Sequence, residues 1–259
     1  MRTLTVILPC YNEQENLPAL LKSWFAIQND LQDSGYGLSI VCVDDGSADD
    51  TNFIIAREAE KRPNVVLLTH EKNQGLGRAL ATGLLYFRER SASGDLALTM
   101  DSDNTHAPEY VFPMLARTRQ GADCVIASRY ASGASTRGVP ARRLFLSDCA
   151  RYYYSLVLNV KNVRDYTCGY RLYTFEIIKR ALTYHGSDLI TQNGFACMME
   201  LLYKLHTLDA AFAEVPFELR YDNKLGKSKM KLLKTIFYSL STAARLRLRH
   251  KPPRLEEVK

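Results

Sequence analysis

Two aspartates, Asp101 and Asp103, follow a short apolar run over residues 96–100. Side chains at positions i and i+2 of an extended strand end point to the same side, so both carboxylates are expected to face one hard cation. Such oxygen ligands suit Mg²⁺ or Mn²⁺, and Mg²⁺ commonly shares its coordination with water and substrate phosphates. The pattern predicts a metal-bridged nucleotide. A polar loop after a strand is the ordinary alternative, because a D-x-D pattern is short and common.

The composition describes a chain that can fold around a large core. It has 259 residues, is 46% hydrophobic and carries a formal net charge of +6. This suits one large domain, or one domain with an added segment. No apolar run approaches the roughly 18 residues needed to span a bilayer, and the N-terminus lacks the pattern of a signal peptide. We therefore expect a cytoplasmic protein. None of the six cysteines forms a C-x-x-C pair, which predicts neither a zinc site nor a disulfide framework.

Strand-like apolar runs alternate with helical patterns through the first half of the chain. The expected strands are residues 4–8, 38–43, 65–68, 96–100 and 124–127. The expected helices are residues 14–31, 49–61, 76–90 and 108–119. This alternation predicts an α/β fold with a mostly parallel sheet and helices on both faces. The small residues of the segment 131–139 predict a mobile loop.

Chemically distinctive residues follow each of the first four expected strands. Ligands of parallel sheets bind beyond the carboxyl ends of the strands, so these residues are expected to share one site. Asp45 could accept hydrogen bonds from a nucleotide, or its Asp-Gly-Ser turn could cap the next helix. Glu13 could contact a nucleoside, or it could stabilise the N-terminus of the first helix.

Two further patterns resemble nucleotide-binding loops but are incomplete. Gly75 and Gly77 match part of the dinucleotide fingerprint, yet its third glycine is missing and they do not directly follow the first strand. Gly226-Lys227-Ser228 lacks the earlier glycine of a phosphate loop, because that position is Asp222. We therefore expect neither an NAD site nor a Walker-type ATPase.

Six short motifs occur in order along the chain. They are Pro9-Cys10-Tyr11-Asn12-Glu13, Val43-Asp44-Asp45-Gly46-Ser47, Asn73-Gln74-Gly75, Asp101-Ser102-Asp103, Ser128-Arg129-Tyr130 and Asp165-Tyr166-Thr167-Cys168-Gly169-Tyr170-Arg171. Their order resembles the family 2 glycosyltransferases, and within that family they are most similar to dolichyl-phosphate mannosyltransferase and its bacterial polyprenyl-phosphate hexosyltransferase relatives. The resemblance spans residues 3 to about 230. It implies a GT-A, Rossmann-like fold, a nucleotide-sugar donor, a divalent cation and inversion at the anomeric carbon.

The resemblance also implies roles for individual residues. Those at nucleoside-holding positions are Pro9, Tyr11, Glu13, Val43 and Asp45. Those at positions contacting diphosphate and metal are Asp101, Ser102 and Asp103. Arg129 matches a donor or acceptor phosphate contact, Arg143 and Ser147 match residues that hold the lipid phosphate, and Lys229 matches a basic residue closing over the donor.

Two positions depart from the pattern of the mannosyltransferases. Thr105 stands where they often have a glutamine as third metal ligand, and Asn223 stands where they have an arginine. Arg220 or Lys224 could replace the missing charge. These departures leave GDP-mannose and UDP-glucose, or another UDP-hexose, as equal candidates for the donor.

A phosphate acceptor would change what the protein must supply. A hydroxyl nucleophile needs a general base, whereas a lipid phosphate is already anionic and needs only to be held. Arg129, Arg142 and Arg143 could hold it, although a solvated basic loop is the alternative. Asp165 and Glu200 are candidates for a base or for orienting the sugar, and a buried ion pair is the structural alternative for each.

The C-terminal segment is strongly basic, so we divide the chain into a catalytic domain over residues 1–222 and a helical segment over 223–259. Residues 224–259 contain 11 Lys or Arg and 2 acidic residues. This basic amphipathic helix could lie on an anionic membrane, pack on the catalytic domain or meet a membrane-embedded partner subunit. No nucleic-acid-binding module is recognised. The expected apolar stripe is Met230, Leu232, Leu233, Ile236, Phe237, Leu240, Ala244 and Leu248.

Together these patterns predict a metal-dependent, inverting hexosyltransferase that acts on polyprenyl phosphate at the cytoplasmic membrane face. One alternative is a family 2 transferase that acts on a hydroxyl of a soluble or glycan acceptor. Another is a noncatalytic protein that binds sugar nucleotides, since fold alone does not establish activity.

Overall fold

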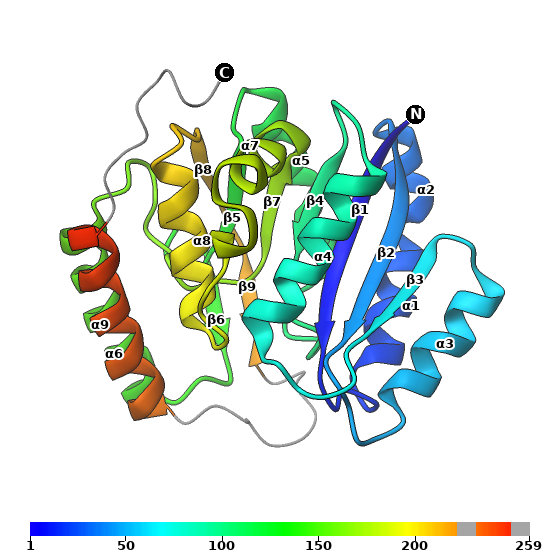
Figure 1. Ribbon diagram of the computed structural model, residues 1–259, viewed down its shortest axis with the longest axis horizontal. Coiled ribbons are helices and arrows are strands. Elements are labelled where there is room, and N and C mark those ends of the chain that lie inside the picture. The colour runs from blue at the N-terminus through cyan, green and yellow to red at the C-terminus, as the bar shows by residue number, and fades with distance from the viewer. Residues whose placement is uncertain (222–231, 250–259) are drawn as a thin grey trace.

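The strands expected from the sequence are present and lie in one sheet (Figure 1). The computed structural model describes residues 1–221 and 232–249, and within them it leaves aside the side chains of residues 142–143, 232–237 and 249. The large sheet has seven strands in the order β3-β2-β1-β4-β7-β5-β8. These are β1 (Arg2–Cys10), β2 (Tyr36–Asp44), β3 (Val65–Thr69), β4 (Leu96–Thr99), β5 (Cys124–Ser128), β7 (Arg171–Thr174) and β8 (Phe212–Pro216).

The large sheet is mostly parallel, as predicted, but β7 runs antiparallel to both of its neighbours, β4 and β5. The sequence reading did not identify this four-residue strand. Because β7 runs in the opposite direction, its first residue lies beside the end of β4, where Arg171 pairs with Thr99. The loop before β7 is therefore brought to the carboxyl edge of the parallel strands.

A separate pair of short strands involves the loop that was expected to be mobile. Within residues 131–139, β6 (Ser135–Arg137) pairs in parallel with β9 (Glu218–Arg220). Arg137 Nε lies 2.5 Å from Glu218 Oε1 across this pair. The strand and the ion pair hold the middle of the loop.

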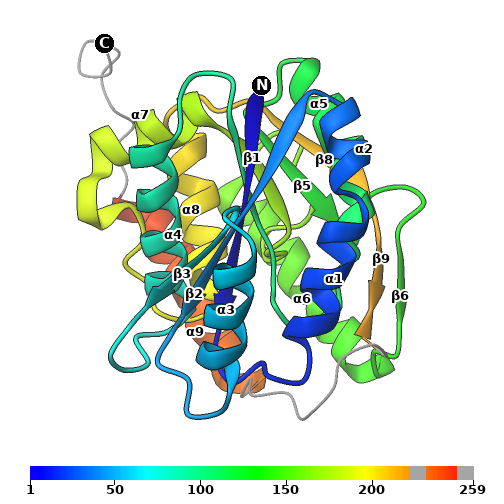
Figure 2. The same cartoon turned by 90° about the vertical axis from the view of Figure 1, so that its right-hand side faces the viewer.

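Helices cover both faces of the sheet, with α4, α7 and α8 on one side and α1, α2 and α5 on the other (Figure 2). The expected helix 76–90 is confirmed with the same bounds, whereas the expected helix 14–31 is two helices that meet at Ile27. The helices are α1 (Leu17–Ala26), α2 (Gln28–Asp33), α3 (Thr51–Lys61), α4 (Leu76–Arg90), α5 (Val111–Arg119), α6 (Ala141–Leu158), α7 (Phe175–His185), α8 (Ala196–His206) and α9 (Leu232–Arg249), with short 3₁₀ turns at Pro108–Tyr110 and Gly186–Leu189.

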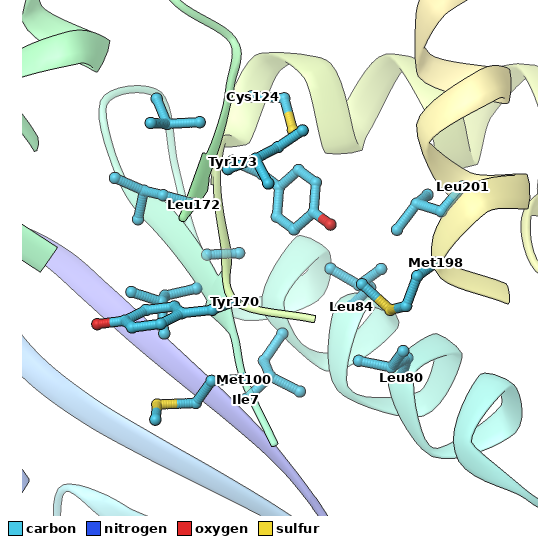
Figure 3. Close-up of a cluster of buried hydrophobic side chains, with 14 of the residues drawn as sticks. Ile7, Leu80, Leu84, Met100, Cys124, Tyr170, Leu172, Tyr173, Met198 and Leu201 are labelled. Atoms are coloured by element: carbon cyan, nitrogen blue, oxygen red, sulfur yellow. The ribbon is translucent and has the colours of Figure 1, made fainter. Parts of the chain in front are cut away.

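The core lies between the sheet and its helices. Leu84 of α4, Tyr173 of β7 and Met198 of α8 meet on one side of the sheet, while Leu172 points to the other side (Figure 3). All four are at most 2% exposed. Burial of a side chain of this size contributes about 1.5–3 kcal/mol, so this layer holds α4 and α8 firmly against β7.

Helices α6 and α9 lie side by side at one end of the molecule (Figure 1). Tyr153 Oη donates to Leu240 O at 3.1 Å, and Tyr154 Oη lies 2.7 Å from Ser239 Oγ. Of the apolar stripe expected in this region, Leu248 is 86% exposed, whereas Ser239, Thr242 and Ala243 supply buried positions. The part of the C-terminal segment that the structure describes therefore packs on α6 and α8.

Among the described residues, no helix combines the length and the apolar character needed to cross a membrane. The six cysteines are unpaired; five are buried and Cys149 is exposed.

The two glycines that partly match a dinucleotide fingerprint have a packing explanation. The segment before α8 crosses the N-terminus of α4 so closely that Gly77 N donates to Asn193 O at 3.0 Å. A Cβ on Gly77 would lie 1.8 Å from Gln192 O, and a Cβ on Gly75 would lie 2.4 Å from Asn193 O. Gly75 also has a φ of +94°, which side chains disfavour. Both glycines permit this close approach of two backbones.

We expect Gly77→Ala to destabilise the protein by about 1–3 kcal/mol, because the new methyl group overlaps a backbone carbonyl. In an uncrowded helix the same change would stabilise by up to about 1 kcal/mol. Urea unfolding measures the difference. Gly194→Ala is the control, since nothing lies within 4 Å of its Cβ position. A Gly77→Ala variant as stable as the parent protein would contradict the proposed role of this crossing.

Candidate active site

A cavity of about 410 Å³ opens at the carboxyl edge of the sheet. In Figure 1 this is the lower edge, where the arrowheads of β1 and β2 end. The register shows how these ends converge: β1 and β2 end together, with Cys10 paired to Asp44, and Thr99 at the end of β4 pairs with Ile7, so the turn after β4 continues beside the last residues of β1. The predicted residues that line the cavity are Pro9, Tyr11, Glu13, Asp45, Asp101, Ser102, Asp103, Arg129 and Ser147.

Of the other predicted site residues, the structure places one away from the cavity and does not describe two. The Val43 side chain is fully buried in a small cluster with Val41 and Ala79, and it faces the core rather than the cavity. The side chain of Arg143 lies outside the described residues, as does Lys229. The same holds for Asn223 and Lys224. Arg220, the other candidate for the missing charge, lies in β9 with its Nη1 3.8 Å from Glu218 Oε2.

Asp101 and Asp103 share the cavity for a reason other than strand alternation. Strand β4 ends at Thr99, so the expectation that both carboxylates extend the strand is wrong. They belong to the turn that follows, in which Asn104 has a φ of +60°. Asp103 Oδ1 accepts hydrogen bonds from Thr105 Oγ1 at 2.6 Å and from Thr105 N at 3.3 Å. Thr105, one of the two departures from the family pattern, therefore orients Asp103.

The turn is fastened to its neighbours on both sides. Ser102 Oγ donates to Pro9 O at 2.8 Å, which joins the turn to the end of β1. Gly169 faces Asp101, and a Cβ at that position would lie only 3.0 Å from Asp101 Oδ1. Glycine therefore keeps space open beside this carboxylate, as a ligand or a cation on Asp101 would require.

Asp45 does not cap the following helix. Its Oδ1 accepts from Gln74 N at 2.9 Å and its Oδ2 accepts from Gly75 N at 2.7 Å. His70 Nδ1 lies 2.7 Å from Asp45 Oδ1. In α3 the first turn is instead bound by Asp49, which accepts from Thr51. Asp45 therefore fixes the loop before α4, where it also borders the cavity.

The position of Glu13 is compatible with both of its predicted roles, a nucleoside contact and stabilisation of the first helix. Its backbone carbonyl accepts from Asn16 N at 3.1 Å and Leu17 N at 2.9 Å, at the start of α1. Its carboxylate accepts from Asn16 Nδ2 at 2.8 Å. Glu13 thus organises the entry to α1 while lining the cavity.

Arg129 forms a buried ion pair with Asp165. Its Nε and Nη2 donate to the two oxygens of Asp165 at 2.8 and 2.7 Å, and Nη2 also donates to Thr167 Oγ1 at 2.7 Å. The Asp165 side chain is 0% exposed. Burial alone would raise the pKa of this carboxyl, but the Arg129 guanidinium and the backbone N–H donors hold the pKa below its ordinary value. Asp165 is therefore ionised and fully engaged.

Glu200 is engaged in the same way. Its Oε1 lies 2.6 Å from Lys204 Nζ, and its two oxygens accept from the backbone N–H groups of Thr191 and Gln192 and from the Thr191 hydroxyl. It is 1% exposed. For both Asp165 and Glu200 the structure thus shows the buried ion pair, and it shows what each pair holds in place.

The family model described as Glycosyl transferase family 2 matches residues 5–182, more than half of the 259-residue chain. The chain belongs to glycosyl transferase family 2. As a glycosyltransferase it has the site expected of its fold, at the carboxyl edge of the sheet and beside the D-x-D turn. The predicted family and enzyme class are confirmed.

Three curated relatives of this glycosyltransferase are similar over most of its length. Polyprenol monophosphomannose synthase of Mycolicibacterium smegmatis is 33% identical, over 88% of this chain and 81% of its own. Undecaprenyl-phosphate mannosyltransferase of Micrococcus luteus is 32% identical, over 89% of this chain and 88% of its own. Dolichol-phosphate mannosyltransferase of Pyrococcus furiosus is 33% identical, over 94% of this chain and 63% of its own.

Solved structures confirm the predicted GT-A fold. A mannosyltransferase from Pyrobaculum calidifontis in complex with GDP-mannose and Mn²⁺ matches with a TM-score of 0.61 and 17% identity, over 96% of this chain and 65% of its own. Mannosyl-3-phosphoglycerate synthase from Rubrobacter xylanophilus matches with a TM-score of 0.60 and 16% identity, over 96% of this chain and 74% of its own.

The sequence reading missed several residues that line the cavity of this glycosyltransferase. Arg151 and Tyr154 lie on the same face of α6 as Ser147, four and seven residues further on. Helical spacing from Ser147 could have identified both. Others are His106, Phe195 and Tyr221, for which the sequence carried no comparable signal, whereas Tyr130 belongs to the motif Ser128-Arg129-Tyr130 but was given no role.

We expect Asp165→Asn to lower the free energy of unfolding by about 3–5 kcal/mol near neutral pH, because it leaves the Arg129 charge without its partner. The pKa of Asp165 is lower in the folded than in the unfolded protein, so its stabilisation is present above an unfolded pKa of about 4. It is lost as the pH falls through the folded pKa.

Urea unfolding of both proteins between neutral and acidic pH measures this change. Glu58→Gln is the control, because Glu58 pairs with the exposed side chains of Lys61 and Arg62. Loss of that pair is expected to cost about 0–1 kcal/mol. Equal losses for the two variants would contradict the role assigned to Asp165.

Proposed function

We propose that the protein transfers a hexose from a GDP- or UDP-sugar to polyprenyl phosphate, with inversion at the anomeric carbon. The relatives support the acceptor, because the three at 32–33% identity are named for polyprenol, undecaprenyl phosphate and dolichol phosphate. All three names also specify mannose, which makes mannose the first sugar to test. A relative at 29% identity is named a dolichyl-phosphate β-glucosyltransferase, so glucose is the second.

Of the two acids considered as general bases, Asp165 lines the cavity and Glu200 does not, and the state of both supports a phosphate rather than a hydroxyl acceptor. A hydroxyl would need a general base with a free lone pair within hydrogen-bond reach. Asp165 and Glu200, the two candidates for that role, are both held in buried ion pairs. A lipid phosphate is already anionic and requires only positioning opposite the anomeric carbon. The observation that carries the proposal is therefore the engagement of these two acids in a chain so similar to lipid-phosphate transferases.

The donor side of the proposal rests on Asp101 and Asp103. Within the described part of the chain, no three His, Cys, Asp or Glu side chains gather in a way that could hold a metal ion. Two carboxylates fit Mg²⁺ or Mn²⁺ only if diphosphate oxygens and water complete the coordination, which is usual for these ions. A bound cation would supply positive charge to the departing nucleoside diphosphate. The space that Gly169 leaves beside Asp101 suits this arrangement.

Helix α6 supports a position of the protein on a membrane surface. Its inner face, with Ser147 and Arg151, lines the cavity. Its outer face exposes Phe145, Tyr152 and Leu156, whose side chains are 68%, 67% and 82% exposed. With about 100° between successive helical residues, these two sets lie on opposite sides of α6. We propose that this outer face, the α6 apolar stripe, rests on the cytoplasmic face of a bilayer that contains the acceptor.

Product formation by the purified protein tests the function. The assay combines GDP- and UDP-hexoses with Mn²⁺ or Mg²⁺, with and without a short polyprenyl phosphate. We expect transfer only when the lipid phosphate is present, loss of transfer with EDTA and its recovery with added metal. Transfer to a glycan or soluble hydroxyl in place of the lipid phosphate would overturn the acceptor, and donor binding without transfer to any acceptor would overturn catalysis.

We expect Asp103→Asn to reduce turnover by about 10²–10³-fold, because it removes charge from the side that faces the donor diphosphate. Asparagine keeps an oxygen that can accept from Thr105, so the turn is expected to persist. Asp33→Asn is the matched control, since it removes an exposed carboxylate of α2 outside the cavity. Thermal unfolding midpoints establish that both variants are folded. Turnover by Asp103→Asn within twofold of the parent would contradict the predicted metal site.

We expect Leu156→Glu to lower binding to vesicles containing anionic lipid by about tenfold or more, because it replaces an inserted apolar side chain by a charge. Co-sedimentation with the vesicles measures the bound fraction. Phe53→Glu is the control, because Phe53 is 65% exposed on α3, away from α6. Equal losses for the two variants, or no loss for either, would contradict docking through the α6 apolar stripe.

A further inference from the structure

Arg151 projects from α6 into the cavity wall, and no motif assigned it a role. It follows Ser147 by four residues, so the two side chains are neighbours on one face of the helix. Tyr154 continues the same face one turn further and also lines the cavity. Arg151 therefore shares the cavity face of α6 with Ser147, to which the family resemblance assigns a contact with the acceptor phosphate.

The guanidinium of Arg151 is held between two aromatic rings. Its Cζ lies 4.6 Å from the centroid of the Tyr130 ring and 4.4 Å from that of the Tyr152 ring. Both distances are within the range of cation–π attraction. The side chain is only 23% exposed. The two rings fix the position of the charge while leaving the N–H groups at the edge of the guanidinium for other partners.

The Nε–H group is poorly satisfied. Arg151 Nε is buried and makes no hydrogen bond to the described residues. The carboxylate of Asp148 lies 3.5 Å from it, and that side chain is 50% exposed. Charge-assisted hydrogen bonds between arginine and a carboxylate are usually about 2.7–2.9 Å long. Asp148 is therefore a weak partner, screened by water, for the mostly buried guanidinium of Arg151.

Arg129, by contrast, has strong hydrogen-bond partners. The described residues contribute two arginines to the cavity wall, Arg129 and Arg151. Arg129 makes hydrogen bonds of 2.7–2.8 Å to the buried carboxylate of Asp165 and to Thr167, and Asp165 neutralises its charge. Breaking such a pair is costly. Of the two, Arg151 is the cation that can exchange its partner for a ligand at little cost.

The neighbour of Arg151 indicates which ligand this is. Tyr152 belongs to the exposed α6 apolar stripe, and its ring contacts the Arg151 guanidinium, so the guanidinium reaches from the cavity face of the helix to the edge of this stripe. A ligand with a phosphate at Arg151 and an apolar chain can place that chain over this side of α6. A nucleoside diphosphate has no group that would use the apolar side.

We propose that Arg151 is a ligand of the acceptor's phosphate, released from Asp148 when an amphiphile with a phosphate head binds. This rests on the proposed function, and it adds a residue that determines the preference for a phosphorylated lipid. Ser147 and Arg151 would together contact the phosphate, while the Tyr130 and Tyr152 rings keep the guanidinium in place.

Initial rates at varied acceptor and varied donor test the proposal in Arg151→Gln, Arg151→Lys and Asp148→Asn. We expect Arg151→Gln to raise the KM for polyprenyl phosphate by about tenfold or more and to leave the KM for the donor within twofold. Arg151→Lys should recover part of the loss, because lysine keeps the charge but not the planar fork. Asp148→Asn should lower the acceptor KM, because it removes the competing carboxylate.

Arg90→Gln is the matched control. Arg90 also lies over a tyrosine on a helix, with its Cζ 5.7 Å from the Tyr86 ring, but it is outside the cavity. We expect no change in either KM. A rise in donor KM in Arg151→Gln, with acceptor KM unchanged, would assign Arg151 to the donor diphosphate and overturn the proposal. Unchanged values for both substrates would leave Arg151 a purely structural cation.

A binding measurement separates failure of this proposal from failure of the proposed function. Calorimetry compares polyprenyl phosphate with the uncharged polyprenol, for the parent protein and for Arg151→Gln. We expect the parent to prefer the phosphate and the variant to lose about tenfold of that preference, whether or not sugar is transferred. If the parent transfers no sugar but shows this difference, the proposed function fails and the role of Arg151 stands. If the two proteins bind both lipids alike, the role of Arg151 fails.

Discussion

The carboxylate of Asp165 is the interaction on which the geometry of the site depends most. It accepts the Arg129 guanidinium and the backbone N–H groups of Arg129, Thr167 and Cys168. The bonds from Arg129 join the end of β5 to the loop before β7, although Arg129 and Asp165 are 36 positions apart in the sequence. Because the loop is held there, Gly169 lies against Asp101, and a Cβ at its position would lie only 3.0 Å from Asp101 Oδ1. Arg129, which the family resemblance identified as a phosphate contact, thus holds Asp165 and the loop that forms part of the cavity wall.

A second buried carboxylate, that of Glu200, holds the segment before α8 in place. Glu200, paired with Lys204, binds the backbone of residues 191–192. That segment crosses the N-terminus of α4 at Gly75 and Gly77. The loop that leads into α4 also donates its Gln74 and Gly75 N–H groups to the carboxylate of Asp45. The loop before α4 is therefore positioned from both directions. Buried ion pairs of this kind add little net stability relative to an apolar core, but they fix which backbone groups meet.

Helix α6 connects the cavity with the surface of the protein. Its inner residues line the cavity, its tyrosines bind α9, and its outer residues are exposed and apolar. A soluble acceptor would need no such face. For the C-terminal segment the sequence left open a membrane surface, the catalytic domain or a partner subunit, and over the residues that the structure describes this segment contributes α9, which packs on α6 and α8. The apolar surface lies on α6, adjacent to the arginine that we assign to the acceptor.

The sequence by itself determined the elements whose signals are local. The bounds of α4, five of the six parallel strands of the large sheet, the residues at the ends of β1, β2 and β4 that line the cavity, and the family could all be predicted from periodicity and short motifs. Tertiary structure decided the rest, because partners distant in the chain are selected by packing and not by neighbouring residues. It placed β7 between β4 and β5, directed Val43 into the core, and assigned Thr105 to Asp103. It also engaged Arg129 with Asp165 and left Arg151 with a weak partner, a difference between two arginines that no pattern of residue types could show. The physical reason is that the charge available to a ligand depends on burial and on competing partners, and both exist only once the chain has folded.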